Sequence, residues 1–228
     1  MKILYKSRDT IAALKPPGVP SQPDPTGDGD MLTLLSEHMR ALGEHRELYL
    51  VHRLDRAVGG VMIFARNKKS AASLSGQAAE HTLTKKYYAV VEGLAEEKAY
   101  LKDYLYKDSA KGKAFVVDRA RAGVKEATLS YERVGAVETE RGTLSLLLVT
   151  LMSGRFHQIR AQLSSRGLSI VGDGKYGSRD KRTRCALFCH SMTFSERGDV
   201  RCVSALPDLT AYPWSHFAEK FAGREELI

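Results

Sequence analysis

The sequence has no long apolar run and no leader-like start, and both absences exclude a class of protein. No segment approaches the roughly 18 consecutive apolar residues that a membrane-spanning helix needs. The opening stretch, MKILYKSRDT, turns polar before the apolar core of a signal peptide could form. We therefore expect a folded cytoplasmic protein that has no membrane partner.

Cysteine is also scarce, with only Cys185, Cys189 and Cys202 present. The first two are four residues apart, and His190 follows the second. A structural zinc site would need a second pair of ligands upstream, and the sequence offers none. We expect three reduced thiols in or near core strands, and no metal.

Acidic residues are outnumbered, since 27 of them face 35 lysines and arginines and leave a net charge of +8. Such an excess favours a polyanionic partner through phosphate contacts and counterion release. The basic residues are spread along the chain apart from short clusters such as RDKRTR at 179–184. Charge alone therefore does not identify nucleic acid as the partner. With 43% apolar residues, the chain has enough material for a full core.

Linkers and internal repeats are absent, and secondary-structure signals follow one another along the whole chain. Short β-like runs at 2–5 and 10–14 lead into residues 15–30, whose five prolines and three glycines predict a long polar loop. Apolar spacing predicts helices at 31–42, closed by Gly43, and at 68–81. Further strands are expected at about 86–92, 126–134, 143–151, 186–195 and 200–204, and further helices at 155–166 and 214–222. Because the strands cluster without regular βαβ alternation, we expect an α+β fold with a largely antiparallel mixed sheet and flanking helices and loops.

One informative stretch is LVHRLDRAVGGVMIFARN, residues 50–67. A strand pattern at 48–51 runs into a turn where a single carboxylate, Asp55, stands between Arg53 and Arg56. A glycine pair and a second apolar run follow. Taken alone, an aspartate before glycines is as well explained by capping a turn.

A second informative stretch is LVTLMSGRFHQIRAQLSSRGLSIVGDGKYG, residues 148–177. It reads as a buried strand, a Ser-Gly turn and a helix that opens with Arg155, His157 and Arg160. Helical spacing places His157 and Arg160 together near the first turn, where unpaired backbone N–H groups also favour anions. Taken singly, arginines on an amphipathic helix are usually solvated. Asp173 and Tyr176, in the glycine-rich loop that follows, read as structural residues.

Four ordered motifs together resemble the RluA family of RNA pseudouridine synthases. They are HRLD at 52–55 with its glycine pair, KKYYAVVEG at 85–93, GRFHQIR at 154–160 and GDGKYG at 172–177. LKPPGVPSQP at 14–23 is similar to that family's lysine-proline-glycine loop, and the resemblance runs from about residue 10 to about residue 195. Two positions differ: the family usually has Thr-Ser-Gly where this chain has Val58-Gly59-Gly60, and Thr where it has Phe156.

The resemblance implies the pseudouridine synthase catalytic fold, as one domain over residues 1–228 with no separate N-terminal RNA-binding domain. It also implies a reaction that needs no cofactor, in which uridine of ribosomal or transfer RNA is rejoined to its sugar through C5. Asp55 would be the catalytic carboxylate, either as nucleophile at C1′ or as base at C2′. Arg160 matches the family's arginine, which would keep that carboxylate ionised.

Tyr87 matches the family's active-site tyrosine, suited to stack on the displaced base and to relay a proton. The plain alternative is a core tyrosine, and strand alternation predicts that Tyr87 and Tyr88 point to opposite faces. The expected substrate-binding residues are His52, Arg53, Arg155, His157 and Lys15. Of these, Arg53 would fill the gap that the flipped nucleotide leaves. Lys15 either touches RNA or is solvated.

Two functions from other classes compete with this reading. A non-catalytic RNA-binding module would fit the basic charge equally well, but it has no use for a carboxylate that repels its ligand. A phosphotransferase is suggested by the likeness of HRLD to a kinase catalytic loop, but the glycine-rich loop upstream and the Asp-Phe-Gly downstream are missing. We expect the protein to act as a monomer.

Overall fold

The computed structural model describes residues 1–222, which form two compact units. Unit 1 contains Met1–Lys85 and Phe188–Pro207, and unit 2 contains Lys86–Leu187 and residues 208–222. Most strand pairings within the units are antiparallel, and few helices accompany them, which confirms the predicted α+β class. The expectation of one catalytic domain over residues 1–228 stays a prediction.

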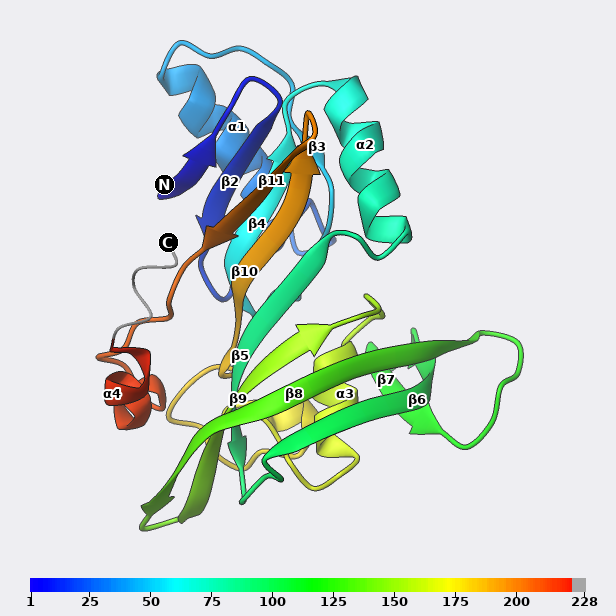
Figure 1. Ribbon diagram of the computed structural model, residues 1–228, viewed down its shortest axis with the longest axis vertical. Helices are drawn as coiled ribbons and strands as arrows, with labels where there is room; N and C mark the ends of the chain where they lie inside the picture. Colours follow the sequence, from blue (N-terminus) through cyan, green and yellow to red (C-terminus); the bar gives the residue numbers. More distant parts are fainter. Residues whose placement is uncertain (223–228) are drawn as a thin grey trace. The chain divides into compact units, whose positions relative to one another are not determined.

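Unit 1 is built on a sheet whose central strand is β4. Its strands are β1 (Ile3–Lys6), β2 (Thr10–Lys15), β3 (Tyr49–Leu50), β4 (Gly59–Ala65), β10 (Leu187–Glu196) and β11 (Asp199–Ser204). They hydrogen-bond in the order β1-β2-β4-β10-β11, and β3 pairs with the far end of β4 (Figure 1). Every residue of β4 is buried, as its continuous apolar sequence predicts. β4 and β10 run parallel and pair through Gly59 and Gly60.

Two helices of unit 1 confirm the helices predicted at 31–42 and 68–81, the first with its predicted glycine stop. Helix α1 (Met31–Ala41) begins after Asp30, whose carboxylate accepts from the backbone N–H groups of the first turn, and it ends before Gly43 at φ +81°. It buries Met31, Leu35 and Met39, which lie on one stripe. Helix α2 (Lys68–Ala79) is capped by Asn67, whose side chain accepts from the Ser70 N–H at 2.9 Å.

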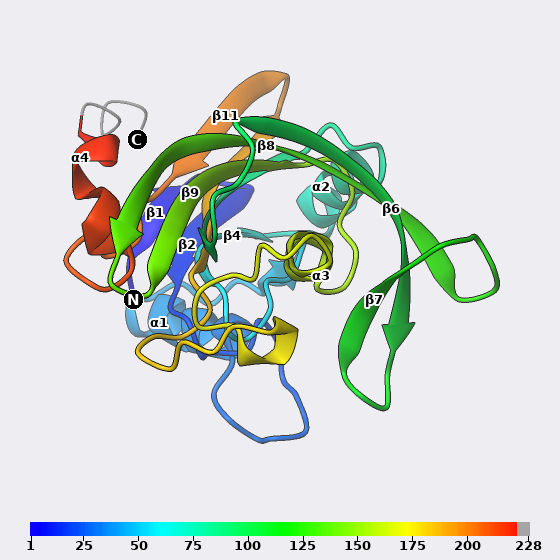
Figure 2. The same ribbon diagram turned by 90° about the horizontal axis from the view of Figure 1, so that it is seen from below.

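Unit 2 is a curved sheet with a short helix on its concave side. Its strands are β5 (Thr84–Glu92, of which the first two residues belong to unit 1), β6 (Lys98–Asp108), β7 (Lys113–Val117), β8 (Val124–Thr139) and β9 (Gly142–Leu151), in the order β5-β9-β8-β6-β7. Figure 2 shows helix α3 (Gln158–Ser164) inside the curve, where Ala161 packs with Leu105, Ala114 and Ala127. The 3₁₀ turns η1 (Gly174–Tyr176) and η2 (Trp214–Phe217) and the one-turn helix α4 (Ala218–Phe221) complete the unit.

The structure corrects three sequence-based expectations. β6 and β7 lie in residues 93–125, for which no element was predicted, because the exposed face of β6 carries lysine and tyrosine instead of a plain polar alternation. The helix expected at 155–166 is only Gln158–Ser164, and it starts late because His157, directly before it, adopts a left-handed φ of 52°. Residues 214–221 form a 3₁₀ turn and a single α-turn in place of one helix.

Replacing Gly60 should destabilise the fold strongly. Gly60 has φ +125°, and an added Cβ would lie 2.3 Å from the Cys189 carbonyl oxygen and 2.5 Å from its nitrogen. We expect Gly60→Ala to lower the free energy of unfolding by at least about 3 kcal/mol, measured by chemical denaturation. Gly76→Ala is the control, because nothing lies within 4 Å of its Cβ position in α2, and alanine there should raise stability by up to about 1 kcal/mol. Equal effects of the two changes would contradict this account of Gly60.

Candidate functional site

The predicted site residues are distributed over both units, and the surroundings of each set are defined within its unit. Unit 1 holds Lys15, His52, Arg53 and Asp55, and unit 2 holds Tyr87, Arg155, His157 and Arg160. Their surroundings range from full burial, as for Lys15, to exposure, as for Arg53.

Asp55 lies on the loop that joins the hairpin strands β3 and β4. The Asp55 carbonyl accepts from the Val58 N–H at 2.9 Å, which closes a tight turn directly before the glycine pair. The side chain of Asp55 is partly exposed. The first strand of this hairpin is short and half-buried, whereas every residue of β4 is buried.

The proline-rich loop, residues 16–30, fastens the Asp55 loop by backbone and hydroxyl contacts. The Ser21 hydroxyl donates to the Leu54 carbonyl at 2.7 Å and accepts from the Leu54 N–H at 3.0 Å. On the other side of Asp55, the Gly18 N–H donates to the Arg56 carbonyl at 2.7 Å. Because Leu54 and Arg56 are both held, the position of Asp55 between them is fixed by a second loop.

Lys15 lies beneath this pair of loops and has no exposed surface. Its ammonium group donates to the carbonyl oxygens of Pro16, Arg56 and Val58 at 3.1, 3.2 and 2.7 Å. Burial lowers the pKa of Lys15 to about 8, against the attraction of Asp55, which raises it. At pH 7 the group therefore remains mostly charged, and its three N–H groups match the three carbonyls. The expectation of a solvated Lys15 is wrong, and its predicted contact with RNA stays a prediction.

The two arginines beside Asp55 have different surroundings. Arg56 forms an ion pair with Asp28 and lies 3.6 Å from a carboxylate oxygen of Asp24, so it ties the Asp55 loop to the proline-rich loop. Arg53 is exposed. Both arginines are exposed, and they differ in that the Arg56 guanidinium is held by Asp28 of the proline-rich loop.

His52 is buried, and it holds the Asp55 loop against β4. Its Nε2 accepts from the Ile63 N–H at 3.1 Å. Burial, and secondarily the charge of Lys85, lowers the pKa of His52 to about 3, so the ring is neutral at physiological pH. The structure gives His52 a positioning role, and its expected RNA contact stays a prediction.

In unit 2, Arg160 forms a buried bidentate ion pair with Asp173. Its Nε and one Nη donate to the two carboxylate oxygens at 2.7 and 2.8 Å, and the side chains are 6% and 2% exposed. The Tyr176 ring lies against the guanidinium, 4.9 Å from its central carbon to the ring centroid. The alternative of a solvated arginine is therefore wrong for Arg160. The plane of its guanidinium is fixed by the Asp173 carboxylate and by the Tyr176 ring.

His157 belongs to the same cluster through Tyr176. Its Nδ1 lies 3.0 Å from the Tyr176 hydroxyl oxygen, which also accepts from the Ala114 N–H at 2.7 Å. Burial, and then the charge of Arg160, lowers the pKa of His157 to about 3. The His157 ring is therefore neutral at physiological pH, and one hydrogen bond joins its Nδ1 to the Tyr176 hydroxyl. Phe156 stacks on the His157 ring with centroids 3.8 Å apart.

Tyr87 and Tyr88 are both buried in β5, 5% and 1% exposed. Tyr88 packs edge-on against Phe221 at 4.8 Å between centroids. Strand alternation points the two side chains to opposite faces, and because β5 is buried on both faces here, neither tyrosine is exposed to solvent. Arg155 is partly exposed, and its Nε donates to the Glu126 carbonyl at 2.9 Å.

Asp173 and Ser21 are the important residues that sequence reasoning did not assign to the site. Asp173 was predicted to be a structural loop residue, and it does have a structural role. Nothing in its local sequence indicated that Arg160 would be its partner. Ser21 gave no signal beyond its place in a proline-rich loop. In both cases the partner comes from a different segment of the chain.

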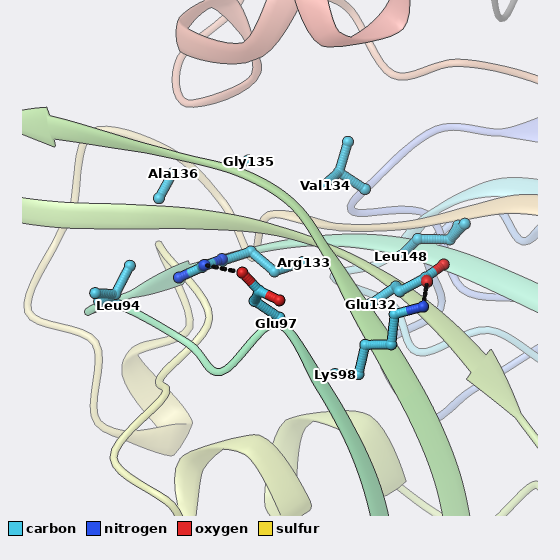
Figure 3. Close-up of a pocket in the computed structure, with 9 residues that line it drawn as sticks. All are labelled: Leu94, Glu97, Lys98, Glu132, Arg133, Val134, Gly135, Ala136 and Leu148. Atoms are coloured by element: carbon cyan, nitrogen blue, oxygen red, sulfur yellow. Dashed lines mark ion pairs between the residues drawn. The ribbon is translucent and has the colours of Figure 1, made fainter.

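The remaining features of the described residues add no second candidate centre. A hollow at the bulge of β8 is lined by Leu94, Val134, Gly135, Ala136 and Leu148 and is flanked by the ion pairs Lys98–Glu132 and Arg133–Glu97 (Figure 3). It contains no predicted site residue. Within residues 1–222, no group of three or more histidine, cysteine or acidic side chains could hold a metal ion. Over the same residues, no helix has the length and apolar character required to cross a bilayer.

The Arg160–Asp173 pair should contribute strongly to the stability of unit 2. Asp173→Asn removes one charge and leaves a buried guanidinium, so we expect a loss of about 3 kcal/mol in the free energy of unfolding, measured in urea. Asp199→Asn is the matched control, because its pair with Arg201 has the same 2.8 Å contact but is 68% and 44% exposed. That change should cost less than about 1 kcal/mol. A similar loss in both variants would mean that burial does not determine the strength of the pair.

Comparisons with known proteins agree with this arrangement of motifs. Residues 9–165 match the family model described as RNA pseudouridylate synthase. The chain is 30% identical over 183 residues to an uncharacterized RNA pseudouridine synthase, YhcT, of Bacillus subtilis, covering 79% of this chain and 59% of the relative. It is 29% identical to tRNA pseudouridine synthase C of Haemophilus ducreyi, covering 81% of this chain and 77% of the relative.

A third relative is ribosomal large subunit pseudouridine synthase D of Zymomonas mobilis, 27% identical over 86% of this chain and 62% of the relative. The chain thus spans about three fifths of the length of two of these relatives. The solved structure of human RNA pseudouridylate synthase domain containing 1 has the same fold, with a TM-score of 0.75 and 23% identity over 93% of this chain and 85% of that one. These relatives confirm the resemblance to the RluA family, and because the family model covers more than half of the sequence, the chain belongs to the RNA pseudouridylate synthase family.

Proposed function

We propose that this protein isomerises uridine to pseudouridine in structured RNA. The observation that carries the proposal is the family match, which includes Asp55, Tyr87 and Arg160. Relatives named for transfer RNA and for the large ribosomal subunit support these two RNAs as the substrate class. The proposed enzyme acts as a monomer in the cytoplasm and uses no cofactor.

The reaction is an isomerisation, so its atoms balance without another reactant. The N1–C1′ bond of uridine breaks, the uracil turns, and a C5–C1′ bond forms. The hydrogen on C5 is lost to solvent, and N1 gains a proton. Because the target base has to leave its stack, the favoured sites are loops or distorted helices.

Asp55 is the proposed catalytic carboxylate, as nucleophile at C1′ or as base at C2′. Its loop is fastened on both sides, at Leu54 and at Arg56, which supports a role that needs fixed geometry. The charged Lys15 beneath the loop favours an ionised carboxylate at this position.

Arg160 is proposed to orient and stabilise the Asp55 carboxylate during the reaction, and Tyr87 to stack on the displaced uracil and relay a proton. The bidentate pair with Asp173 and the ring of Tyr176 support a positioned guanidinium in place of a mobile one. The burial of Tyr87 supports contact with an apolar base face.

The remaining proposed RNA contacts differ in how directly their surroundings support them. Arg53 is exposed and is the best-supported candidate for filling the gap in the RNA stack. Arg155 and His157 are partly exposed at the start of α3 and are proposed to contact RNA there. His52 and Lys15 are buried, so for both we propose that they support RNA binding by holding the Asp55 loop.

The competing function is a non-catalytic RNA-binding module of the same fold. It predicts RNA binding without isomerisation, whereas the proposed enzyme predicts both. Release of tritium from RNA labelled at uridine C5, without added nucleotide or metal, separates the two functions.

Asp55→Asn should abolish turnover and leave RNA binding intact. The change keeps the size of the side chain but removes its charge and its nucleophilic or basic oxygen, so tritium release should fall by at least about a thousandfold. RNA affinity should be equal or slightly higher, because a charge that repels phosphate is gone. The control is Asp24→Asn in the proline-rich loop, which should retain activity within about tenfold.

Two outcomes would count against this assignment. If Asp55→Asn loses its fold and its RNA binding together, the aspartate is a turn cap. If it still forms pseudouridine at an appreciable rate, the catalytic assignment is wrong. Circular dichroism and a binding titration on the same preparation distinguish these outcomes.

Arg160→Lys should lower kcat by about a hundredfold with little change in KM, because an ammonium cannot replace the two-pronged guanidinium contact. In the Asp55→Asn background the same change should cause little further loss, since the two groups serve one step. The control for folding is the double variant Arg160→Met, Asp173→Leu, which removes both buried charges and should fold but remain inactive. Full activity in Arg160→Lys, or losses that add independently, would contradict the proposed role.

A further inference from the structure

The exposed face of β6 carries a row of tyrosines. Alternation along the strand sends Leu101 and Leu105 into the core beneath α3 and sends Tyr100, Tyr104 and Tyr106 to the opposite side. Tyr100 is 64% exposed and Tyr106 is 37% exposed. On the neighbouring strand β7, Phe115 pairs directly with Tyr106 and so lies on the same side. We call Tyr100, Tyr104, Tyr106 and Phe115 the tyrosine face.

Basic side chains surround the β7 end of the tyrosine face. The amino groups of Lys111 and Lys113 lie 5.6 and 5.3 Å from the centroid of Phe115, and the Arg121 guanidinium lies 5.7 Å from that of Tyr106. The segment from residue 98 to residue 125 contains eight basic and three acidic residues, so it carries +5 of the protein's net charge of +8. Of these cations, Lys111, Lys113 and Arg121 lie beside the rings of the tyrosine face, whereas Lys107 lies 4.9 Å from the centroid of Phe156, on the core side of the strand.

The other end of the face is electrostatically balanced. Lys98 pairs with Glu132, and Lys102 lies 3.1 Å from a carboxylate oxygen of Glu126. These pairs flank Tyr100 on both sides along the strand. A polyanion should consequently bind more strongly near Tyr104 and Tyr106 than near Tyr100.

Exposed aromatic rings interleaved with cations on an open sheet match the chemistry of single-stranded RNA. Each base has an apolar face that stacks on a ring, and each phosphate is attracted to a neighbouring cation. A protein partner would instead favour a face whose core is depleted of charge.

We propose that the tyrosine face binds a single-stranded segment of the substrate RNA, with bases stacked on Tyr104 and Tyr106 and phosphates held by Lys113 and Arg121. The proposal rests on the proposed function, because it names a second contact surface for the same RNA.

The test is the binding of a fluorescein-labelled oligouridine of about 12 nucleotides to the full chain, followed by fluorescence anisotropy. Tyr104→Ala combined with Tyr106→Ala should weaken binding by at least about tenfold, and oligoadenosine should show a similar loss because stacking tolerates any base. The matched control, Tyr104→Phe with Tyr106→Phe, keeps both rings and should bind within about twofold of the original protein.

The cations give a second, independent readout. Lys113→Ala and Arg121→Ala should each reduce the steepness of the salt dependence by about 0.7 in a log–log plot, which corresponds to one phosphate contact. Lys181→Ala, an exposed lysine outside the hairpin, should leave the slope unchanged. Irradiation of an oligonucleotide carrying 5-iodouridine should cross-link to the peptide that contains residues 98–108, and this requires no substitution in case the tyrosine variants fold poorly.

Normal affinity in a folded Tyr104→Ala, Tyr106→Ala variant, or cross-links confined to other peptides, would overturn the proposal. Loss of self-association in sedimentation, with RNA affinity unchanged, would overturn it in favour of a second copy of the chain. The proposal is separable from the function of Asp55: weakened oligouridine binding without pseudouridine formation by the original protein would reject the enzyme and keep the surface. Pseudouridine formation by the original protein, with oligouridine binding unchanged in the tyrosine variant, would keep the enzyme and reject the surface.

Discussion

The ammonium group of Lys15 is the contact on which the geometry around Asp55 depends. A buried amine with three N–H groups is satisfied only when three acceptors converge on it, and here the acceptors are the backbone carbonyls of Pro16 in the proline-rich loop and of Arg56 and Val58 in the Asp55 turn. The charge therefore fixes backbone positions instead of side chains. Because two of the carbonyls belong to Arg56 and Val58, a displacement of the Asp55 loop would leave a buried cation without acceptors.

In unit 2, a buried guanidinium is likewise held by partners in fixed positions. Arg160 is buried as Lys15 is, and it is held by the Asp173 carboxylate and the Tyr176 ring in place of carbonyls. The two cations differ in what they define, because the planar guanidinium fixes a direction while the ammonium fixes a position. The proposed mechanism needs one cation that holds the Asp55 loop in place and another that presents two parallel N–H donors. Lys15 in unit 1 has the residue type for the first role, and Arg160 in unit 2 has it for the second.

Local patterns in the sequence were sufficient for the elements whose signals lie within a few residues. Helix α1 has apolar residues at helical spacing and a closing glycine, and β4 is apolar throughout, so both were predicted. The burial of Lys15 was not predictable, because its acceptors Arg56 and Val58 are 41 and 43 residues away in the chain. Strand β6 was not predicted, because its outer face carries tyrosines as well as lysines and the alternation of apolar and polar residues is therefore not regular. The resemblance supplied candidate roles, whereas contacts between distant segments decided which of those residues are buried supports.

The distribution of charge separates proposed chemistry from proposed affinity. Three cations of the motifs are held by groups of the protein itself. Lys15 donates to backbone carbonyls, Arg56 pairs with an aspartate of the proline-rich loop, and Arg160 donates two of its N–H groups to Asp173. Cations that hold loops and carboxylates are poorly placed to neutralise many phosphates as well. Residues 98–125 carry +5 of the net charge of +8, and Lys111, Lys113 and Arg121 of this segment lie beside the tyrosine face. The proposed RNA affinity and the proposed turnover should therefore respond to separate sets of substitutions. The buried cations of the motifs are constrained by the geometry of their partners, whereas the cations near β6 and β7 are constrained mainly by their charge.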